Sequence, residues 1–79
     1  MSLSATLETA LAQAAAAEGR HVVPVSFSLD YGVPTEGLLT VEARIDRATR
    51  SLVFVHGEAI DAAGRRAATA SGVFRTAQG

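Results

Sequence analysis

Residues 3–17 carry the hydrophobic pattern of a helix. The segment LSATLETALAQAAAA has no glycine or proline and is rich in alanine, the residue with the highest helix propensity. Ser2 or Ser4 can cap its start, and Gly19 is suited to the position just after its end. Its apolar positions recur at the helical period and comprise Leu3, Leu7, Ala10, Leu11 and Ala14. This narrow, smooth face favours close packing onto a sheet.

From His21 onward the hydrophobic period changes from that of a helix to that of a strand. We expect strands at residues 21–29, 38–46, 51–60 and 66–75. The second of these alternates cleanly, with Leu39, Val41, Ala43 and Ile45 on one face and Thr40, Glu42, Arg44 and Asp46 on the other. This alternation predicts that one face of the strand is buried and the other is exposed to solvent. In the first segment Pro24 predicts a bulge or an unpaired stretch, because proline cannot donate a ladder hydrogen bond.

The connections between these segments are rich in turn-forming residues. Residues 31–37 form a turn-rich link, residues 47–50 a short hairpin turn, and residues 61–65 a second turn in which Gly64 supplies a positive φ. Small residues fill most of the last strand, and Gly57 lies inside the strand before it, which predicts close approach of the helix. The predicted fold is α+β, an N-terminal helix packed against a four-stranded antiparallel meander.

Composition narrows the functional classes. With 79 residues the chain forms one small domain with a small core, and we expect dimerisation to complete it. The absence of cysteine excludes disulfides and thiolate metal sites, and the two distant histidines predict neither a metal site nor a metal cofactor. A net charge of −1 gives no global field to recruit nucleic acid or a membrane. Without a spanning apolar run or a signal peptide, we expect a cytoplasmic protein.

Three stretches of the sequence resemble one known family. They are SATLETALAQAAAA, VSFSLDYGVPTEGLLTVEARI and residues 51–75, which contain the pattern D-x-x-G-R-x-x-A. Together they resemble the hotdog-fold thioesterases, most closely the phenylacetate-degradation and 4-hydroxybenzoyl-CoA type. The resemblance implies a long helix wrapped by a curved antiparallel sheet. It covers only the later part of that family's domain, so residues 1–79 are expected to form a single truncated hotdog-like domain.

The function that the resemblance implies is hydrolysis of acyl-CoA thioesters without a cofactor. In the family, a glycine amide at the helix start polarises the thioester carbonyl, and a carboxylate past the second helical turn acts as nucleophile or base across a dimer interface. Glu8 stands at the position of this carboxylate. The His-Gly-Gly motif, expected immediately before or at Met1, is not in the sequence, and Ala12 replaces a hydroxyl residue common in the family.

Each candidate site residue also has a simpler interpretation. The helix dipole favours a carboxylate near a helix start, so Glu8 need not be catalytic; partial burial beside Leu7 and Leu11 would instead raise its pKa toward that of a base. Arg47 and Arg50 are either solvated turn charges or ligands of the CoA phosphates, whose geometry paired guanidiniums match.

The remaining polar and aromatic candidates favour structural interpretations. Arg65 and Arg66 could bind phosphates in the same way, with weaker support. His56 and Glu58 share one strand face, where a solvated or interface pair is favoured over a catalytic dyad. Phe27, Phe54 and Phe74 are interpreted as core or interface anchors.

Two functional hypotheses therefore remain open. The first is a thioesterase that uses Glu8 and binds acyl-CoA or CoA, with Arg47 and Arg50 holding the phosphates. The second is a truncated, non-catalytic module that binds acyl-CoA or serves only in assembly, since loss of oxyanion donors costs about 10²–10³-fold each. In both cases the exposed sheet edges predict a homodimer or higher homo-oligomer, with strands of two copies joined into one sheet.

Overall fold

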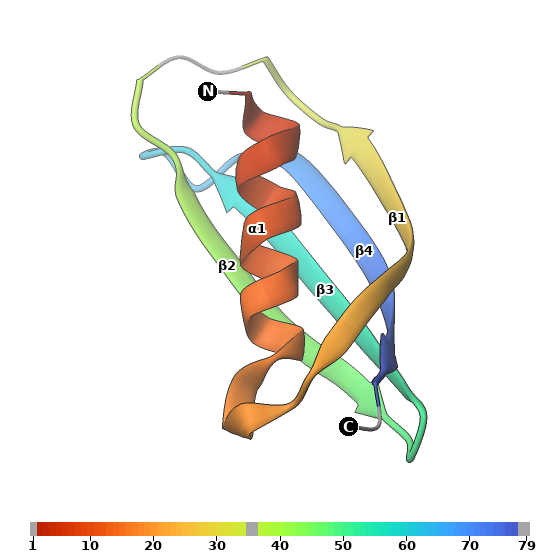
Figure 1. Cartoon of the computed structure of the whole chain (residues 1–79). Coiled ribbons are helices and arrows are strands. Elements are labelled where there is room, and N and C mark those ends of the chain that lie inside the picture. Colours follow the sequence, from red (N-terminus) through yellow and green to blue (C-terminus); the bar gives the residue numbers. More distant parts are fainter. Residues whose placement is uncertain (1, 35–36, 78–79) are drawn as a thin grey trace.

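One helix lies across one face of a four-stranded antiparallel sheet (Figure 1). The computed structural model describes residues 2–34 and 37–77. The elements are α1 (Leu3–Ala15), the short 3₁₀ helix η1 (Ala17–Gly19), β1 (Val22–Tyr31), β2 (Thr40–Ala48), β3 (Leu52–Ile60) and β4 (Arg66–Thr76). The helix and all four strands predicted from the sequence are present. Part of the expected turn at residues 31–37 lies outside the described residues.

The helix α1 begins where the sequence predicts and ends earlier. Ser2 caps it, because its Oγ accepts a hydrogen bond from the amide of Ala5 at 3.1 Å. The α-helix stops at Ala15 rather than at residue 17. The chain then turns toward β1 through two left-handed residues, Glu18 at φ 66° and Gly19 at φ 81°. Gly19 thus ends the helical segment as expected, after one 3₁₀ turn.

The strand order is β1-β4-β3-β2. The expected meander holds for β2, β3 and β4 but is wrong for β1, which pairs with β4 instead of β2. Hairpin turns of a few residues force β2, β3 and β4 to be neighbours. The link between Tyr31 and Thr40 is longer, and its eight residues can reach roughly 26 Å. That exceeds the sheet width of about 14 Å, so β1 and β2 form opposite edges.

A β-bulge interrupts β1 at the predicted place. The register with β4 shifts between Pro24 and Ser26. The sequence alternation would place Val25 on the same face as Phe27, but Val25 is 57% exposed. The reason is that a bulge inserts one unpaired residue and reverses the alternation beyond it.

The core forms where α1 meets the small residues of β3 and β4. The buried residues include Leu7, Leu11, Ala15, Val53, Val55, Ala68, Ala70 and Phe74. Leu11 sits over two glycines: a Cβ on Gly57 would lie 2.8 Å from Leu11 Cδ2, and one on Gly72 would lie 3.2 Å from Leu11 Cδ1. The close approach of the helix that the small residues predict is therefore confirmed.

The turn between β3 and β4 is organised by Asp61. Its carboxylate accepts hydrogen bonds from the amides of Ala63 at 3.0 Å and Arg65 at 2.8 Å, and pairs with the Arg65 guanidinium at 3.0 Å. Gly64 takes the positive φ that the sequence predicts, at 84°. The hydrogen bond from the Arg65 amide is the main cause that lowers the pKa of Asp61 below its ordinary value of 3.8. The hydrogen bond from the Arg65 guanidinium and its positive charge lower this pKa further.

This lowered pKa predicts a pH-dependent contribution of Asp61 to stability. Since the folded pKa lies below the unfolded one, the contribution is present above pH 3.8 and is lost as the pH falls through the folded value. Asp61→Asn should therefore reduce the urea midpoint at neutral pH, and the gap from the wild type should shrink in acid. Asp30→Asn, at an exposed position, controls for the loss of one charge. A gap that stays constant with pH would contradict this assignment.

Candidate functional site

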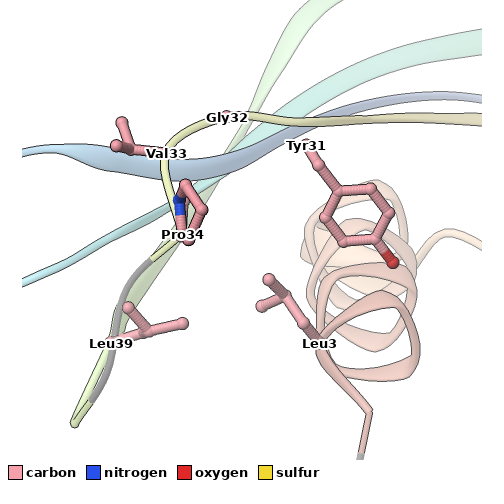
Figure 2. A pocket seen from close by; sticks show the side chains of 7 residues that line it. Leu3, Tyr31, Gly32, Val33, Pro34 and Leu39 are labelled. Carbon is pink, nitrogen blue, oxygen red and sulfur yellow. The ribbon is translucent and has the colours of Figure 1, made fainter.

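An apolar cavity of about 440 Å³ opens at the N-terminal end of α1. It is lined by Leu3, Tyr31, Gly32, Val33, Pro34, Leu39 and Ala67. Figure 2 shows Leu3 projecting from the helix toward Leu39 and Pro34, with the Tyr31 ring beside it. These residues come from the first turn of α1, the end of β1 and the link that follows it, the residue before β2, and β4. None of them is charged, so the space suits an apolar group.

The wall of this cavity depends on a close backbone contact. After β1, the amide of Gly32 donates to the carbonyl of Ala67 at 2.9 Å and the amide of Val33 donates to that of Arg66 at 3.1 Å. A Cβ on Gly32 would lie 2.5 Å from the Arg66 carbonyl oxygen. Only glycine therefore lets the chain stay against β4 here while it turns across the helix end.

The first turn of α1 adds polar groups beside the apolar cavity. Ser2 satisfies the amide of Ala5 and its own carbonyl accepts from the amide of Thr6. Within residues 2–34 and 37–77, the amides of Leu3 and Ser4 have no acceptor, as is usual at a helix start. The partial positive charge there favours an oxygen that carries negative charge. The arrangement can thus accommodate a molecule with an apolar group and an adjacent polarisable carbonyl.

Glu8 is exposed in a single copy, so of the two alternatives left open by the sequence the partly buried carboxylate is not observed. The buried line of the helix runs through Leu7, Leu11 and Ala15, and Glu8 lies about 100° around the axis from Leu7. Glu8 is also about 7.5 Å along the axis and about 140° around it from Leu3. In the described part of the chain its carboxylate makes no hydrogen bond or ion pair. A single copy therefore does not bring Glu8 to the cavity.

The flank of the helix that carries Glu8 faces the β1 edge of the sheet. On the other flank, Thr6, Ala10 and Gln13 line a groove with Val41 of β2. Because β1 and β2 are opposite edges, the flank bearing Glu8 and Ala12 is directed toward β1. In the described chain, β1 has no strand on its outer side. Glu8 is thus placed near a free sheet edge.

Arg47 and Arg50 lie away from both Glu8 and the cavity. The expectation that both flank a turn is wrong for Arg47, which is inside β2 opposite Phe54. The turn is formed one residue later by Thr49, whose amide donates to the Leu52 carbonyl at 2.7 Å. Figure 1 shows this β2–β3 connection beyond the C-terminal end of α1. Both arginines are exposed, and neither forms an ion pair within residues 2–34 and 37–77.

The other sequence candidates have structural partners. Arg65 pairs with Asp61 at 3.0 Å, and Arg66 pairs with Glu58 at 2.9 Å. His56 does not pair with Glu58, since Glu58 Oε2 is held by Arg66. The predicted pair of His56 and Glu58 is therefore not formed in a single copy, because Arg66 holds the Glu58 carboxylate. Among the aromatic residues, Phe74 is buried and Phe27 packs against the core.

The sequence does not predict the cavity. Its pattern predicts only a turn at residues 31–37, yet Tyr31, Val33 and Pro34 line the cavity. The available signal was the apolar character of these residues in a connection that would otherwise be polar. The pairing of β1 with β4, which brings Gly32 to Ala67, could not be read from that signal.

Comparison with known protein families gives one match. The family model described as Thioesterase superfamily matches residues 2–68. No curated protein matches the chain at a significant level. In the described part of the chain, no helix has the length and apolar character needed to cross a membrane.

Three solved structures are similar over nearly the whole chain. AziG from S. sahachiroi is 27% identical, with a TM-score of 0.87 over 95% of this chain and 65% of its own. The BH2602 protein from Bacillus halodurans, solved with CoA, is 23% identical, with a TM-score of 0.82 over 94% and 55%. A mutant hypothetical thioesterase from Streptococcus pneumoniae is 18% identical, with a TM-score of 0.75 over 92% and 65%. The chain thus spans between 55% and 65% of their lengths.

Proposed function

The chain belongs to the thioesterase superfamily and has the expected hotdog fold, and we propose that it hydrolyses acyl-CoA thioesters in a site shared by two copies. The observation that carries this proposal is the uncharged cavity next to the first turn of α1. It offers an apolar space for an acyl group and, in the described part of the chain, amides without an acceptor that can bind the thioester carbonyl. Residues 1–79 act in this proposal as one hotdog-like domain.

In the proposed complex the acyl group occupies the cavity and CoA extends from it along the surface. The CoA in the BH2602 structure supports a ligand of this type. Arg47 and Arg50 bind the CoA phosphates, a role supported by their exposure and by the match of guanidinium and phosphate geometry. Because they lie beyond the far end of α1, they serve the site of a neighbouring copy.

Glu8 is the proposed catalytic carboxylate. As general base it takes a proton from a water molecule, whose oxygen attacks the thioester carbonyl carbon. The carbonyl oxygen becomes negatively charged and is stabilised by amides at a helix start. When the C–S bond breaks, the CoA thiolate leaves and takes up a proton, and the acyl group is released as a carboxylic acid. Alternatively, Glu8 attacks directly and forms an anhydride that water hydrolyses.

We propose that two copies join at β1. Pairing along this edge continues the sheet and covers exposed backbone groups. It also places the Glu8 flank of each helix at the seam, where a second copy can close the site and exclude water. Val25, which the bulge leaves 57% exposed on this edge, would be covered in the same step.

A panel of acyl-CoA substrates tests the proposed function. Hydrolysis is followed by release of the CoA thiol, and CoA binding is measured in parallel by calorimetry. We expect turnover of substrates with uncharged acyl groups small enough for a cavity of about 440 Å³. Binding without turnover would instead support the non-catalytic acyl-CoA module, and absence of both would contradict either function.

A further inference from the structure

Two consecutive residues near the start of β4 are both buried. Ala67 is 6% exposed and Ala68 is 1% exposed. In a regular strand, neighbouring side chains point to opposite faces of the sheet, so one of the two would lie on the face away from α1. The structure describes no element over that outer face (Figure 1). The burial of both alanines therefore indicates that both lie on the helix side of the sheet.

A β-bulge explains why both alanines face the helix. Ala59 of β3 pairs with Ala68, and the next residue, Ile60, pairs with Arg66. Ala67 is therefore the extra residue, which the register passes over. A bulge of this kind sets two residues of one strand against one residue of its partner and redirects a side chain. The side of the sheet to which Ala67 is redirected is the side of the apolar cavity, which Ala67 lines.

The backbone around the bulge is fixed by the end of β1. The Gly32 amide donates to the Ala67 carbonyl at 2.9 Å, and the Val33 amide donates to the Arg66 carbonyl at 3.1 Å. The same crossing is so close that a Cβ on Gly32 would lie 2.5 Å from the Arg66 carbonyl oxygen. Because the strand is tied here, a side chain longer than that of Ala67 would extend into the cavity.

The cavity has a polar side and an apolar side. The amides of Leu3 and Ser4 lie at the start of α1, and Leu3 lines the cavity from the helix. Ala67 lines it from the sheet, which is the opposite layer of the fold. A molecule whose carbonyl binds at the helix start would thus direct its apolar end toward β4. The methyl group of Ala67 leaves more depth there than any larger side chain would.

We propose that Ala67 determines the longest acyl chain that the cavity accepts. The inference rests on the proposed thioesterase function and adds a substrate class to it, the unbranched saturated acyl groups. The acyl carbonyl lies at the start of α1, and the far end of the chain contacts Ala67. Among the lining side chains, only Tyr31 carries a hydrogen-bonding group. An acyl chain with a charged or polar end is therefore disfavoured, because its burial would lack compensating hydrogen bonds.

Replacement of Ala67 by leucine tests this role, because leucine is longer by an isopropyl group. We expect kcat/KM for octanoyl-CoA to fall by at least about tenfold, while that for acetyl-CoA stays within about twofold of the wild type. Ala67→Gly, which removes the methyl group, should shift the preference toward longer chains. It also keeps the test decisive if the leucine variant does not fold, which circular dichroism checks. Ser71→Leu, at an exposed position of the same strand, should leave the chain-length profile unchanged.

A second measurement does not require turnover. Butyrate and octanoate are titrated into the wild type and the variants, and binding is followed by calorimetry. Each carries an apolar chain on a carboxylate, which the helix start favours. The wild type should bind octanoate more tightly than butyrate, since each buried methylene adds about 0.8 kcal/mol. Ala67→Leu should weaken the binding of octanoate and leave that of butyrate nearly unchanged.

The outcomes separate the role of Ala67 from the proposed function. If the wild type hydrolyses acyl-CoA and Ala67→Leu slows all chain lengths by the same factor, Ala67 does not set the chain length, and the thioesterase function stands. If octanoate binding depends on Ala67 and no acyl-CoA is hydrolysed, the cavity role stands and the thioesterase function fails. If the carboxylates do not bind and no acyl-CoA is hydrolysed, both proposals are overturned.

Discussion

Replacement of Glu8 by glutamine is expected to lower the rate of acyl-CoA hydrolysis by about 10²–10⁴-fold, the range that a positioned general base contributes. Glutamine keeps the size and hydrogen-bonding capacity of the side chain and removes its ability to accept the proton of water. The loss should appear in kcat, while CoA binding measured by calorimetry stays the same. Since Glu8 is exposed in one copy, its replacement should leave the thermal midpoint nearly unchanged.

Glu18→Gln is the matched control for the Glu8 variant. It removes the same charge from an exposed carboxylate just beyond the C-terminal end of α1, where Glu18 forms an ion pair with Arg20 at 3.6 Å. Its hydrolysis rate should equal that of the wild type. Equal rates for the wild type and Glu8→Gln would exclude Glu8 as base or nucleophile, while leaving the CoA-binding function open.

Replacement of Leu11 by alanine is expected to cost about 2–5 kcal/mol of unfolding free energy, as for other large-to-small core changes. Leu11 is fully buried and fills the hollow above Gly57 and Gly72, the two positions where the helix comes closest to the sheet. A total stability of about 5–15 kcal/mol makes this loss severe for a small domain. Urea unfolding measures it, and Leu38→Ala, at a 93% exposed position, should change stability by no more than about 0.5 kcal/mol.

Adding Gly57→Ala to this experiment tests the contact itself. In the wild type the new Cβ meets Leu11 Cδ2 at 2.8 Å and the Glu42 carbonyl oxygen at 3.1 Å, so it should destabilise the fold. In the Leu11→Ala background the first clash is gone, and the cost of Gly57→Ala should fall. Strict additivity of the two changes would show that Leu11 does not occupy the hollow above Gly57.

The elements that the sequence predicts well are those set by local pattern. The helix cap at Ser2, the positive φ of Gly64 and the bulge at Pro24 each depend on the chemistry of one residue and its near neighbours. The close approach at Gly57 follows from the lack of a side chain. Each of these features is fixed over a few residues, so a single sequence is enough to predict it.

Features that depend on register could not be predicted in the same way. Strict alternation through Ile45 would direct Arg47 toward the helix, but the register shift between these two residues sends it to the outer face. Similarly, Glu8 is one residue away from a buried position of the helix. It is exposed because the side of the helix that packs on the sheet is the one whose buried residues continue through Ala15. A shift of one position does not alter the composition of the chain, but it moves a side chain from a buried face to an exposed one.

The sequence by itself determined one helix, four strands, the small-residue surface that receives Leu11, and a resemblance that places Glu8 as the carboxylate of interest. Only the tertiary structure decided that β1 pairs with β4, and that Gly32 meets the backbone at Arg66 and so shapes a cavity at the helix start. The physical reason is that hydrophobic period and turn chemistry act over a few residues. Strand order and the cavity instead depend on contacts between segments far apart in the chain, which form only when the whole sheet packs against the helix.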